Sequence, residues 1–289
     1  MKGDLGMVRA LDTSSNGRHL RVGFIGVGTI TEAIVDSLMN GPNADRVQIS
    51  LSPRSASRSA ELASRHRAVR IAEHNQGVID ASETVVIAVL PHQIADVCES
   101  LTFREDQVVV SLAAGWPPSV LRDCVRPATT VCQVIPLPMI GLHTGPIVLY
   151  PHVGEVAQLL TGCGDIITPS HEKDLSVLIC ASAVMSSFFE FQRRVVDWTT
   201  RHGVDALMAK EYVVTLLHGL TTESKQAANG DFAELVTEHE TPNGLNAYLR
   251  RSLTETGAFR DLEHHLDHLL ETRNPSAQDK EIRFDERPA

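Results

Sequence analysis

The chain has 289 residues, of which 43% are hydrophobic and 21% charged, and its formal net charge is −10. This length suffices for two domains with sizeable cores, and the composition is that of a globular protein. The acidic balance argues against a nucleic-acid partner or an anionic membrane surface. Five cysteines without a Cys-x-x-Cys spacing favour a reduced, cytoplasmic protein. Residues 1–18 lack the apolar core of a signal peptide, and we expect no membrane-spanning segment.

A strand, a glycine turn and a helix follow one another near the start of the chain. Residues 22–25 predict a short buried strand, Gly26 and Gly28 a tight turn, and residues 32–39 a helix. In such a unit the first glycine allows the turn, and the second lets the backbone approach a pyrophosphate bound at the helix N-terminus. Thr31 replaces the third glycine of the fingerprint. The pattern predicts a dinucleotide-binding unit, with a ligand-free βα turn as the alternative.

The residues after the second predicted strand, 47–51, indicate which dinucleotide is bound. NAD-specific sites usually place Asp or Glu at this strand end, to hold the ribose 2′-hydroxyl. Here Ser52-Pro53-Arg54-Ser55 follows, and Arg58 lies one helical turn further on. A guanidinium with neighbouring hydroxyls suits a 2′-phosphate. We therefore expect NADP as the cofactor, with a solvated arginine at a helix start as the alternative.

Strands alternate with helices through the rest of the first half. The β-branched run at 84–89 is typical of a parallel strand buried on both faces. We predict an α/β fold with a doubly wound, Rossmann-type, mostly parallel sheet, whose ligand crevice lies at the carboxyl ends of the strands. Further strands are expected at 69–72, 107–112, 130–135 and 145–150, and helices at 55–66, 76–81, from about residue 91, and near 153–161.

The second half is expected to be entirely helical. Residues 172–202 predict one long helix that is apolar nearly all round between 175 and 191, as suits a bundle core or a subunit interface. His264, His265 and His268 have helical spacing, but a solvated helix explains them better than a metal site. Further helices are expected at 205–225, 231–239, 243–255 and 258–271. We predict a disordered N-terminal extension at 1–18, an NADP-binding domain at 19–169, a helical dimerisation and substrate domain at 170–273, and a disordered tail at 274–289.

Five stretches of the chain together resemble the pyrroline-5-carboxylate reductase family, over roughly residues 20–273. The resemblance implies an NADP-dependent oxidoreductase that reduces a cyclic imine, with pyrroline-5-carboxylate to proline as the expected reaction and proline biosynthesis as its setting. It also implies a homodimer joined through the helical domains. The stretches are 24–34, Ser52-Pro53-Arg54, Asn75, Ala88-Val89-Leu90-Pro91 with 111–115, and 241–246 with 253–257.

The resemblance also implies which residues form the site. Thr241 is expected to help hold the substrate carboxylate at the N-terminus of helix 243–255. The residue pattern also suits Thr241 as N-cap with Pro242 as first helical residue, so simple helix capping is the alternative. Asn246 is expected to donate an amide hydrogen bond to the ring nitrogen of the substrate, with a solvated helix residue as the alternative. The expected cofactor-binding residues are Gly26, Gly28, Thr29, Ile30, Ser52, Arg54, Asn75, Ala88, Val89, Leu90, Pro91, Ala113, Ala114 and Gly115.

The chain departs from the family pattern mainly in the substrate-binding parts. Asn246 stands where the family has a threonine, Asn243 where it has glycine, and Leu90 where it usually has lysine. Residues 135–137 and 181–184 also differ from the family's Met-Pro-Asn and Gly-Pro-Ala-Tyr-like stretches. Two alternatives therefore stay open. One is an enzyme like the hydroxyacid dehydrogenases, although no lysine of the helical half sits in their glycine-rich motif. The other is a catalytically weak NADP-binding protein.

Overall fold

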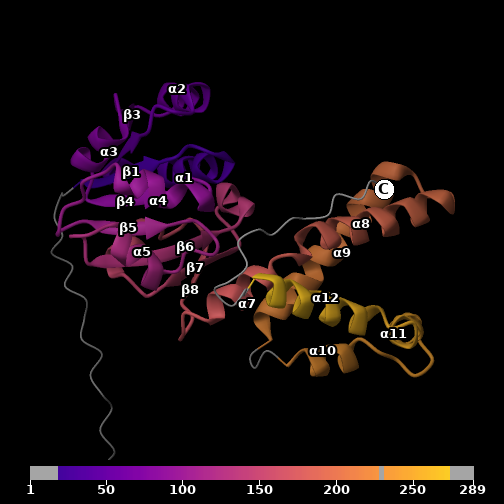
Figure 1. Cartoon of the computed structure of the whole chain (residues 1–289). Coiled ribbons are helices and arrows are strands. Elements are labelled where there is room, and N and C mark those ends of the chain that lie inside the picture. Colours follow the sequence, from indigo (N-terminus) through magenta and orange to yellow (C-terminus); the bar gives the residue numbers. More distant parts are fainter. Residues whose placement is uncertain (1–18, 228–230, 274–289) are drawn as a thin grey trace, which may run out of the picture. The chain divides into compact units, whose positions relative to one another are not determined.

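The computed structural model describes residues 19–227 and 231–273 (Figure 1). The chain divides into two compact units, Met1–Leu175 and Ser176–Ala289. The first holds the sheet and the second is helical, so the predicted fold class is confirmed. The expected disordered ends at 1–18 and 274–289 lie outside the described residues.

The first unit is built on an eight-stranded sheet in the order β3-β2-β1-β4-β5-β6-β7-β8 (Figure 1). All neighbouring pairs are parallel except β6 with β7. The order reverses next to β1, which is the point where open α/β sheets bind ligands. The strands are β1 (Leu20–Ile25), β2 (Val47–Leu51), β3 (Val69–Ile71), β4 (Thr84–Ile87), β5 (Val108–Ser111), β6 (Thr130–Pro136), β7 (Pro146–Tyr150) and β8 (Asp165–Ile167).

Helices cover both faces of this sheet, and the two faces have separate cores. Val86 of β4 belongs to the core under α1, α2 and α6, whereas its neighbours Val85 and Ile87 belong to the core under α3, α4 and α5. The β-branched run is thus buried on both sides, as predicted, and each such side chain contributes about 1.5–3 kcal/mol of burial. The helices are α1 (Thr29–Asn40), α2 (Ala56–Arg65), α3 (Asn75–Ala81), α4 (Ile94–Glu99), α5 (Pro118–Cys124) and α6 (Gly154–Leu159), with 3₁₀ turns η1 (Ala44–Arg46), η2 (Pro91–Gln93) and η3 (Pro138–Leu142).

The helical unit differs from the prediction in its first helix. The predicted helix 172–202 is interrupted at Ser182 and Ala183. The Ser182 hydroxyl donates to the Ile179 carbonyl at 2.6 Å, and the Ala183 N–H bonds the Cys180 carbonyl three residues back. Such local bonds compete with the helical ladder and end the first segment. The helices are α7 (Asp174–Ala181), α8 (Val184–Arg201), α9 (Ala206–Gln226), α10 (Phe232–Glu238), α11 (Leu245–Glu255) and α12 (Ala258–Arg273).

Aspartates begin two of the later helices. Asp205 accepts hydrogen bonds from the N–H groups of Leu207 and Met208 at the start of α9. Asp231 accepts one from the Ala233 N–H at the start of α10. A carboxylate at this position satisfies N–H groups that have no partner within the helix. These caps explain why the predicted starts of both helices lie within one residue of the observed ones.

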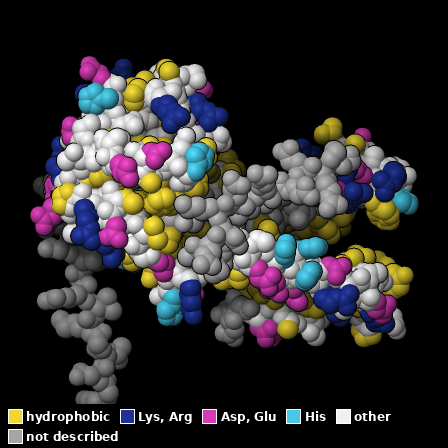
Figure 2. All heavy atoms as spheres, in the orientation of Figure 1, with side chains coloured by type: hydrophobic (Ala, Val, Ile, Leu, Met, Phe, Trp, Pro, Cys, Tyr) yellow, Lys and Arg dark blue, Asp and Glu magenta, His cyan; other side chains and the backbone are white. Residues whose placement is uncertain are grey.

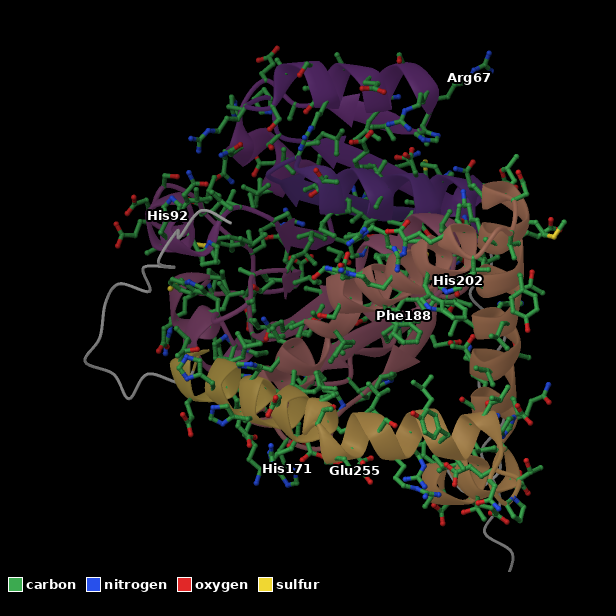
Figure 3. All side chains as sticks on the ribbon, turned by 90° about the vertical axis from the view of Figure 1, so that its right-hand side faces the viewer. Arg67, His92, His171, Phe188, His202 and Glu255 are labelled. Carbon is green, nitrogen blue, oxygen red and sulfur yellow. The ribbon has the colours of Figure 1, made fainter. Side chains whose placement is uncertain are left out.

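The helical unit leaves much apolar surface exposed (Figure 2). On α8, Phe189 is 66% exposed and Trp198 56%, and Phe188, labelled in Figure 3, is 41% exposed. By length and composition alone, Asp174–Arg201 could cross a membrane, with a mean hydropathy of 1.5 over its apolar window. This finding runs against our expectation from the sequence, but one such helix is weak evidence, because interface helices have the same composition. The absence of a membrane partner stays a prediction.

Candidate functional site

Two side chains stabilise the glycine turn after β1 by hydrogen bonds. Gly26 has φ +100°, and a Cβ there would lie 2.7 Å from the Ala88 carbonyl oxygen, so only glycine fits. Its N–H donates to the Ser52 hydroxyl at 2.9 Å, and its carbonyl accepts from the Thr31 hydroxyl at 3.1 Å. Thr31, at the third glycine position of the fingerprint, is buried and closes the turn through its own side chain. The incomplete motif therefore still forms a tight strand–turn–helix unit.

The N-terminus of α1 is open to a ligand. Gly28 precedes the helix in an extended conformation, and no side chain caps the helix. The first backbone bond of the helix is from the Glu32 N–H to the Gly28 carbonyl, which leaves the N–H groups of Thr29, Ile30 and Thr31 unbonded among the described residues. A Cβ on Gly28 would meet nothing within 4 Å. Free N–H groups beside open space fit a pyrophosphate.

The end of β2 provides two free cations. Arg54 and Arg58 are exposed, and neither makes a hydrogen bond or ion pair with any residue that the structure describes. Ser55 lies between them at the start of α2. Ser52 is different: it is 1% exposed, and its hydroxyl already accepts the Gly26 N–H. The arginines and Ser55 are therefore the groups available to a 2′-phosphate, and Ser52 supports the turn.

These features surround one pocket of about 600 Å³ at the carboxyl ends of β1, β2, β4 and β5. Eleven of the predicted cofactor residues line it, whereas Thr29, Ile30 and Gly115 do not. Among the lining residues that the predicted set left out, Gln93 and Val97 could have been indicated by their place on the first turns after β4. The lining consists of Ile25, Gly26, Val27, Gly28, Ser52, Arg54, Ser55, Arg58, Asn75, Ala88, Val89, Leu90, Pro91, Gln93, Val97, Leu112, Ala113 and Ala114.

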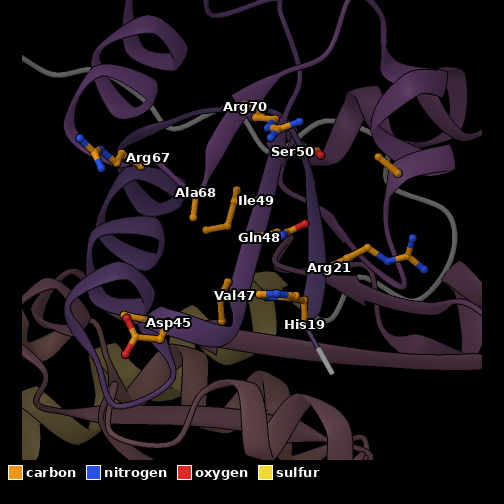
Figure 4. A pocket seen from close by; sticks show the side chains of 12 residues that line it. His19, Arg21, Asp45, Val47, Gln48, Ile49, Ser50, Arg67, Ala68 and Arg70 are labelled. Carbon is orange, nitrogen blue, oxygen red and sulfur yellow. The ribbon is translucent and has the colours of Figure 1, made fainter. Parts of the chain in front are cut away.

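A second hollow, of about 370 Å³, starts beside the segments that precede β1, β2 and β3 and runs along β2 (Figure 4). It is lined by residues before and along these strands, among them His19, Arg67 and Arg70, and by Ala81 at the end of α3. Arg21 on its rim is paired with Glu83 at 3.1 Å. Because nucleotides bind at the carboxyl ends of parallel strands, this hollow is not the dinucleotide site. It supplies control residues for tests of the first pocket.

The predicted substrate loop, residues 241–246, forms a turn before α11. The Gly244 N–H donates to the Thr241 carbonyl at 2.8 Å, which closes a four-residue turn. Pro242 is the second residue of this turn, and Asn243, with φ +60°, is the third. This is a type II turn, which favours proline second and needs a positive φ third. The helix begins at Leu245 with Gly244 as its N-cap, so the expectation that Thr241 caps a helix starting at Pro242 is wrong. The proline completes the turn instead of starting the helix.

The Asn246 side chain is partly engaged within the same loop. Its amide N–H donates to the His239 carbonyl at 2.8 Å. Next to His239, Glu240 pairs with Arg250 of α11, which lowers the pKa of that carboxyl. The His239 ring contacts Glu223 of α9 at 3.2 Å. These bonds anchor the loop to the helices on both sides, and one amide proton of Asn246 remains for a ligand.

No group of three or more His, Cys, Asp or Glu side chains suited to a metal ion occurs among residues 19–227 and 231–273. The five cysteines are all free thiols. The pKa of Cys98 and that of Cys132 are each raised to about 12 by burial, so neither is a thiolate at neutral pH. None of the five cysteines is among the residues that line the pocket.

Residues 21–115 match the family model described as NADP oxidoreductase coenzyme F420-dependent. The chain is 26% identical over 250 residues to pyrroline-5-carboxylate reductase from Vibrio alginolyticus, covering 83% of this chain and 86% of that protein. The chain is thus similar to the pyrroline-5-carboxylate reductases over most of its length.

Solved structures of pyrroline-5-carboxylate reductases have the same fold. The enzyme from Streptococcus pyogenes superimposes with a TM-score of 0.76 at 19% identity, covering 88% of this chain and 98% of that one. The Plasmodium falciparum reductase, whose structure has NADP bound, gives 0.75 at 16% identity, covering 89% and 98%. The resemblance read from the sequence is confirmed.

One departure from the pyrroline-5-carboxylate reductase pattern has a structural explanation. Asn243, which replaces a glycine of that family, sits at φ +60°. Asparagine tolerates this conformation better than other residues with a side chain, so the turn is preserved. Leu90, which replaces the family's usual lysine, is 60% exposed and lines the pocket. It gives the pocket an apolar edge.

Proposed function

We propose that this chain is an NADP-dependent oxidoreductase that reduces a C=N bond, with pyrroline-5-carboxylate or a related cyclic imine as its substrate. The observation that carries the proposal is the pocket at the switch point of the sheet. A helix N-terminus and two arginines lie together there, and none of them has a partner among the described residues. The names of the relatives support the same reaction and cofactor.

Each part of the pocket suits one part of NADP. The N–H groups at the start of α1 would hold the pyrophosphate, and Gly28 leaves room for it. Arg54 and Arg58 beyond β2 would hold the 2′-phosphate. The loops after β4 and β5 lie on the other side of β1 from β2, so they are left for the nicotinamide half of the cofactor. Bound NADPH supplies the hydride, and the protein supplies position and charge.

The loop before α11 is the proposed substrate-binding element. The N–H groups at the start of this 11-residue helix make no bond to a preceding carbonyl until Tyr248, so they can hold a substrate carboxylate with help from the Thr241 hydroxyl. The remaining amide proton of Asn246 is proposed to orient the ring nitrogen. An amide cannot relay a proton as a hydroxyl can, so the imine must bind already protonated. Reduction then adds the hydride to the imine carbon and leaves the nitrogen as an amine.

The test is oxidation of NADPH followed by absorbance, with a panel of cyclic imines with and without a carboxylate. Turnover with pyrroline-5-carboxylate supports the proposal in full, and turnover restricted to another imine corrects only the substrate. Tight NADPH binding without turnover on any imine would favour the weak NADP-binding protein. Oxidation of hydroxy acids instead would favour the dehydrogenase alternative.

We also propose that the helical unit forms a homodimer. Of its described hydrophobic residues, only Cys180, Ala209, Val213 and Ala247 are buried. The exposed aromatic side chains of α8 continue onto α9, where Tyr212 is 67% exposed. An exposed apolar surface of this extent is typical of an interface with another protein. A second copy of the chain carries the same apolar surface and can cover it. Light scattering at micromolar concentration should give at least a dimeric mass; a monomer would refute this.

The proposed location is the cytoplasm.

A further inference from the structure

Two buried polar side chains lie side by side at the carboxyl end of the sheet. Ser111 closes β5, and Gln133 is its register partner on β6. Ser111 is 0% exposed and Gln133 1%. A buried amide or hydroxyl costs free energy unless it is hydrogen-bonded, so each must have a partner.

Both side chains bond the same residue of the pocket wall. The Ala113 N–H donates to the Ser111 hydroxyl at 3.2 Å, and the Gln133 amide donates to the Ala113 carbonyl at 2.6 Å. The Trp116 N–H also reaches this carbonyl, at 3.3 Å. The Ala113 backbone is therefore held at both its polar groups, with Gln133 making the shortest of the three bonds.

This arrangement fixes the direction of the next N–H group. In a trans peptide the carbonyl and the N–H of the following residue point in opposite directions, so the bond from Gln133 turns the Ala114 N–H away from the β6 side. Ala114 lines the pocket, and its N–H makes no hydrogen bond with any described residue. An unpaired donor is thus held in place at the wall of the pocket.

We propose that Gln133 is a positioning residue that holds the Ala114 N–H as a hydrogen-bond donor for the nicotinamide half of the cofactor. This inference rests on the proposed NADP binding in the pocket. The assignment to the nicotinamide half follows from place: Ala114 follows β5, whereas the groups for the 2′-phosphate follow β2 on the other side of β1. Gln133 itself does not line the pocket.

The chain contains a matched control. Gln107, also 0% exposed, donates to the carbonyls of Ile79 and Ser82 at 2.8 and 2.9 Å. It precedes β5, at the opposite end of the strand from Ala113. Gln107→Met and Gln133→Met each remove a buried amide of the same size. Gln133→Met takes one donor from the Ala113 carbonyl, whereas Gln107→Met takes one donor from each of two carbonyls and the acceptor of the Arg104 N–H. Both variants should lower the melting temperature, so stability alone does not distinguish the two roles.

The experiment measures the affinity of full-length wild type and both variants for NADPH and for 2′-phospho-ADP-ribose, which lacks the nicotinamide. Gln133→Met should weaken NADPH binding about three- to tenfold, the effect of one hydrogen bond, and leave the fragment unchanged. Gln107→Met should change neither affinity. Wild-type NADPH affinity in Gln133→Met, or equal losses for both ligands, would overturn the positioning role. A wild type that binds neither ligand would instead overturn the proposed function.

A second variant covers the case in which Gln133→Met does not fold. Burial raises the pKa of a carboxyl at this place, so the side chain in Gln133→Glu is protonated at low pH and can donate to the Ala113 carbonyl. NADP⁺ binding by Gln133→Glu should approach that of wild type at pH 6 and fall below it as the pH rises to 9. A constant ratio to wild type across this range would contradict the proposal.

Discussion

Replacement of Arg54 by alanine is the sharpest test of the cofactor site. Arg54 lines the pocket after β2 and has no partner among the described residues, so its removal breaks no bond within the fold. A charge-assisted hydrogen bond contributes about 1.5–3 kcal/mol. Arg54 is exposed and Arg58 shares the same pocket, so we expect the lower end, about 1.5 kcal/mol, or roughly tenfold in affinity.

The assay is equilibrium binding of NADPH and NADH, followed by the fluorescence of the reduced nicotinamide. Arg54→Ala should weaken NADPH binding about tenfold and leave NADH nearly unchanged, since NADH has no 2′-phosphate. Arg67→Ala is the matched control: Arg67 is also unpaired among the described residues but lines the second hollow, just before β3 (Figure 4). Equal losses for the two cofactors in Arg54→Ala would refute the reading of this residue as the 2′-phosphate ligand.

Three further predictions concern the loop and the cysteines. Asn246→Thr should keep or raise turnover of pyrroline-5-carboxylate, whereas Asn246→Leu should lower it by about 0.5–1.5 kcal/mol; unchanged turnover in the leucine variant would exclude a role. The pKa of His239 is raised by its bond to the neighbouring backbone carbonyl and by Glu223. The stabilisation from this ion pair is therefore present below pH 6.5 and lost as the pH rises through the folded-state pKa, so an NMR titration should show a lower His239 pKa in Glu223→Gln than in wild type, although the Leu235 carbonyl still keeps it raised. Cys124 is only partly buried, unlike Cys98, and should be the first cysteine alkylated in the native protein.

The sheet was predictable because its strands have a simple physical signature. β2 has the expected bounds, and β4 lies within the expected run, since β-branched residues buried on both faces leave a continuous apolar stretch. β8 was not predicted: only three residues long and partly exposed at the sheet edge, it has no periodic pattern. The break at Ser182 was also missed, because one serine in an apolar run does not show where its hydroxyl will bond.

The pocket was predictable in part for a related reason. Gly26, Gly28 and Arg54 stand in local motifs that can be read along the chain. Gln133 lies 20 residues from Ala113, and only the pairing of β5 with β6 brings the two together. The start of α11 was misplaced because Pro242 suits both the second place of a type II turn and the first of a helix, and only Asn243's positive φ decides between them.

The bond from the Thr31 hydroxyl to the Gly26 carbonyl bears on how relatives of this chain would be found or redesigned. A search pattern that demands three glycines passes over any chain in which a hydroxyl closes the turn. Engineering toward the three-glycine fingerprint would destabilise this chain. Thr31→Gly would delete the hydrogen bond to the Gly26 carbonyl. It would also place glycine in the first turn of α1, where the helix propensity of glycine costs about 1 kcal/mol of stability. Serine, which keeps the hydroxyl, is the conservative replacement at this position.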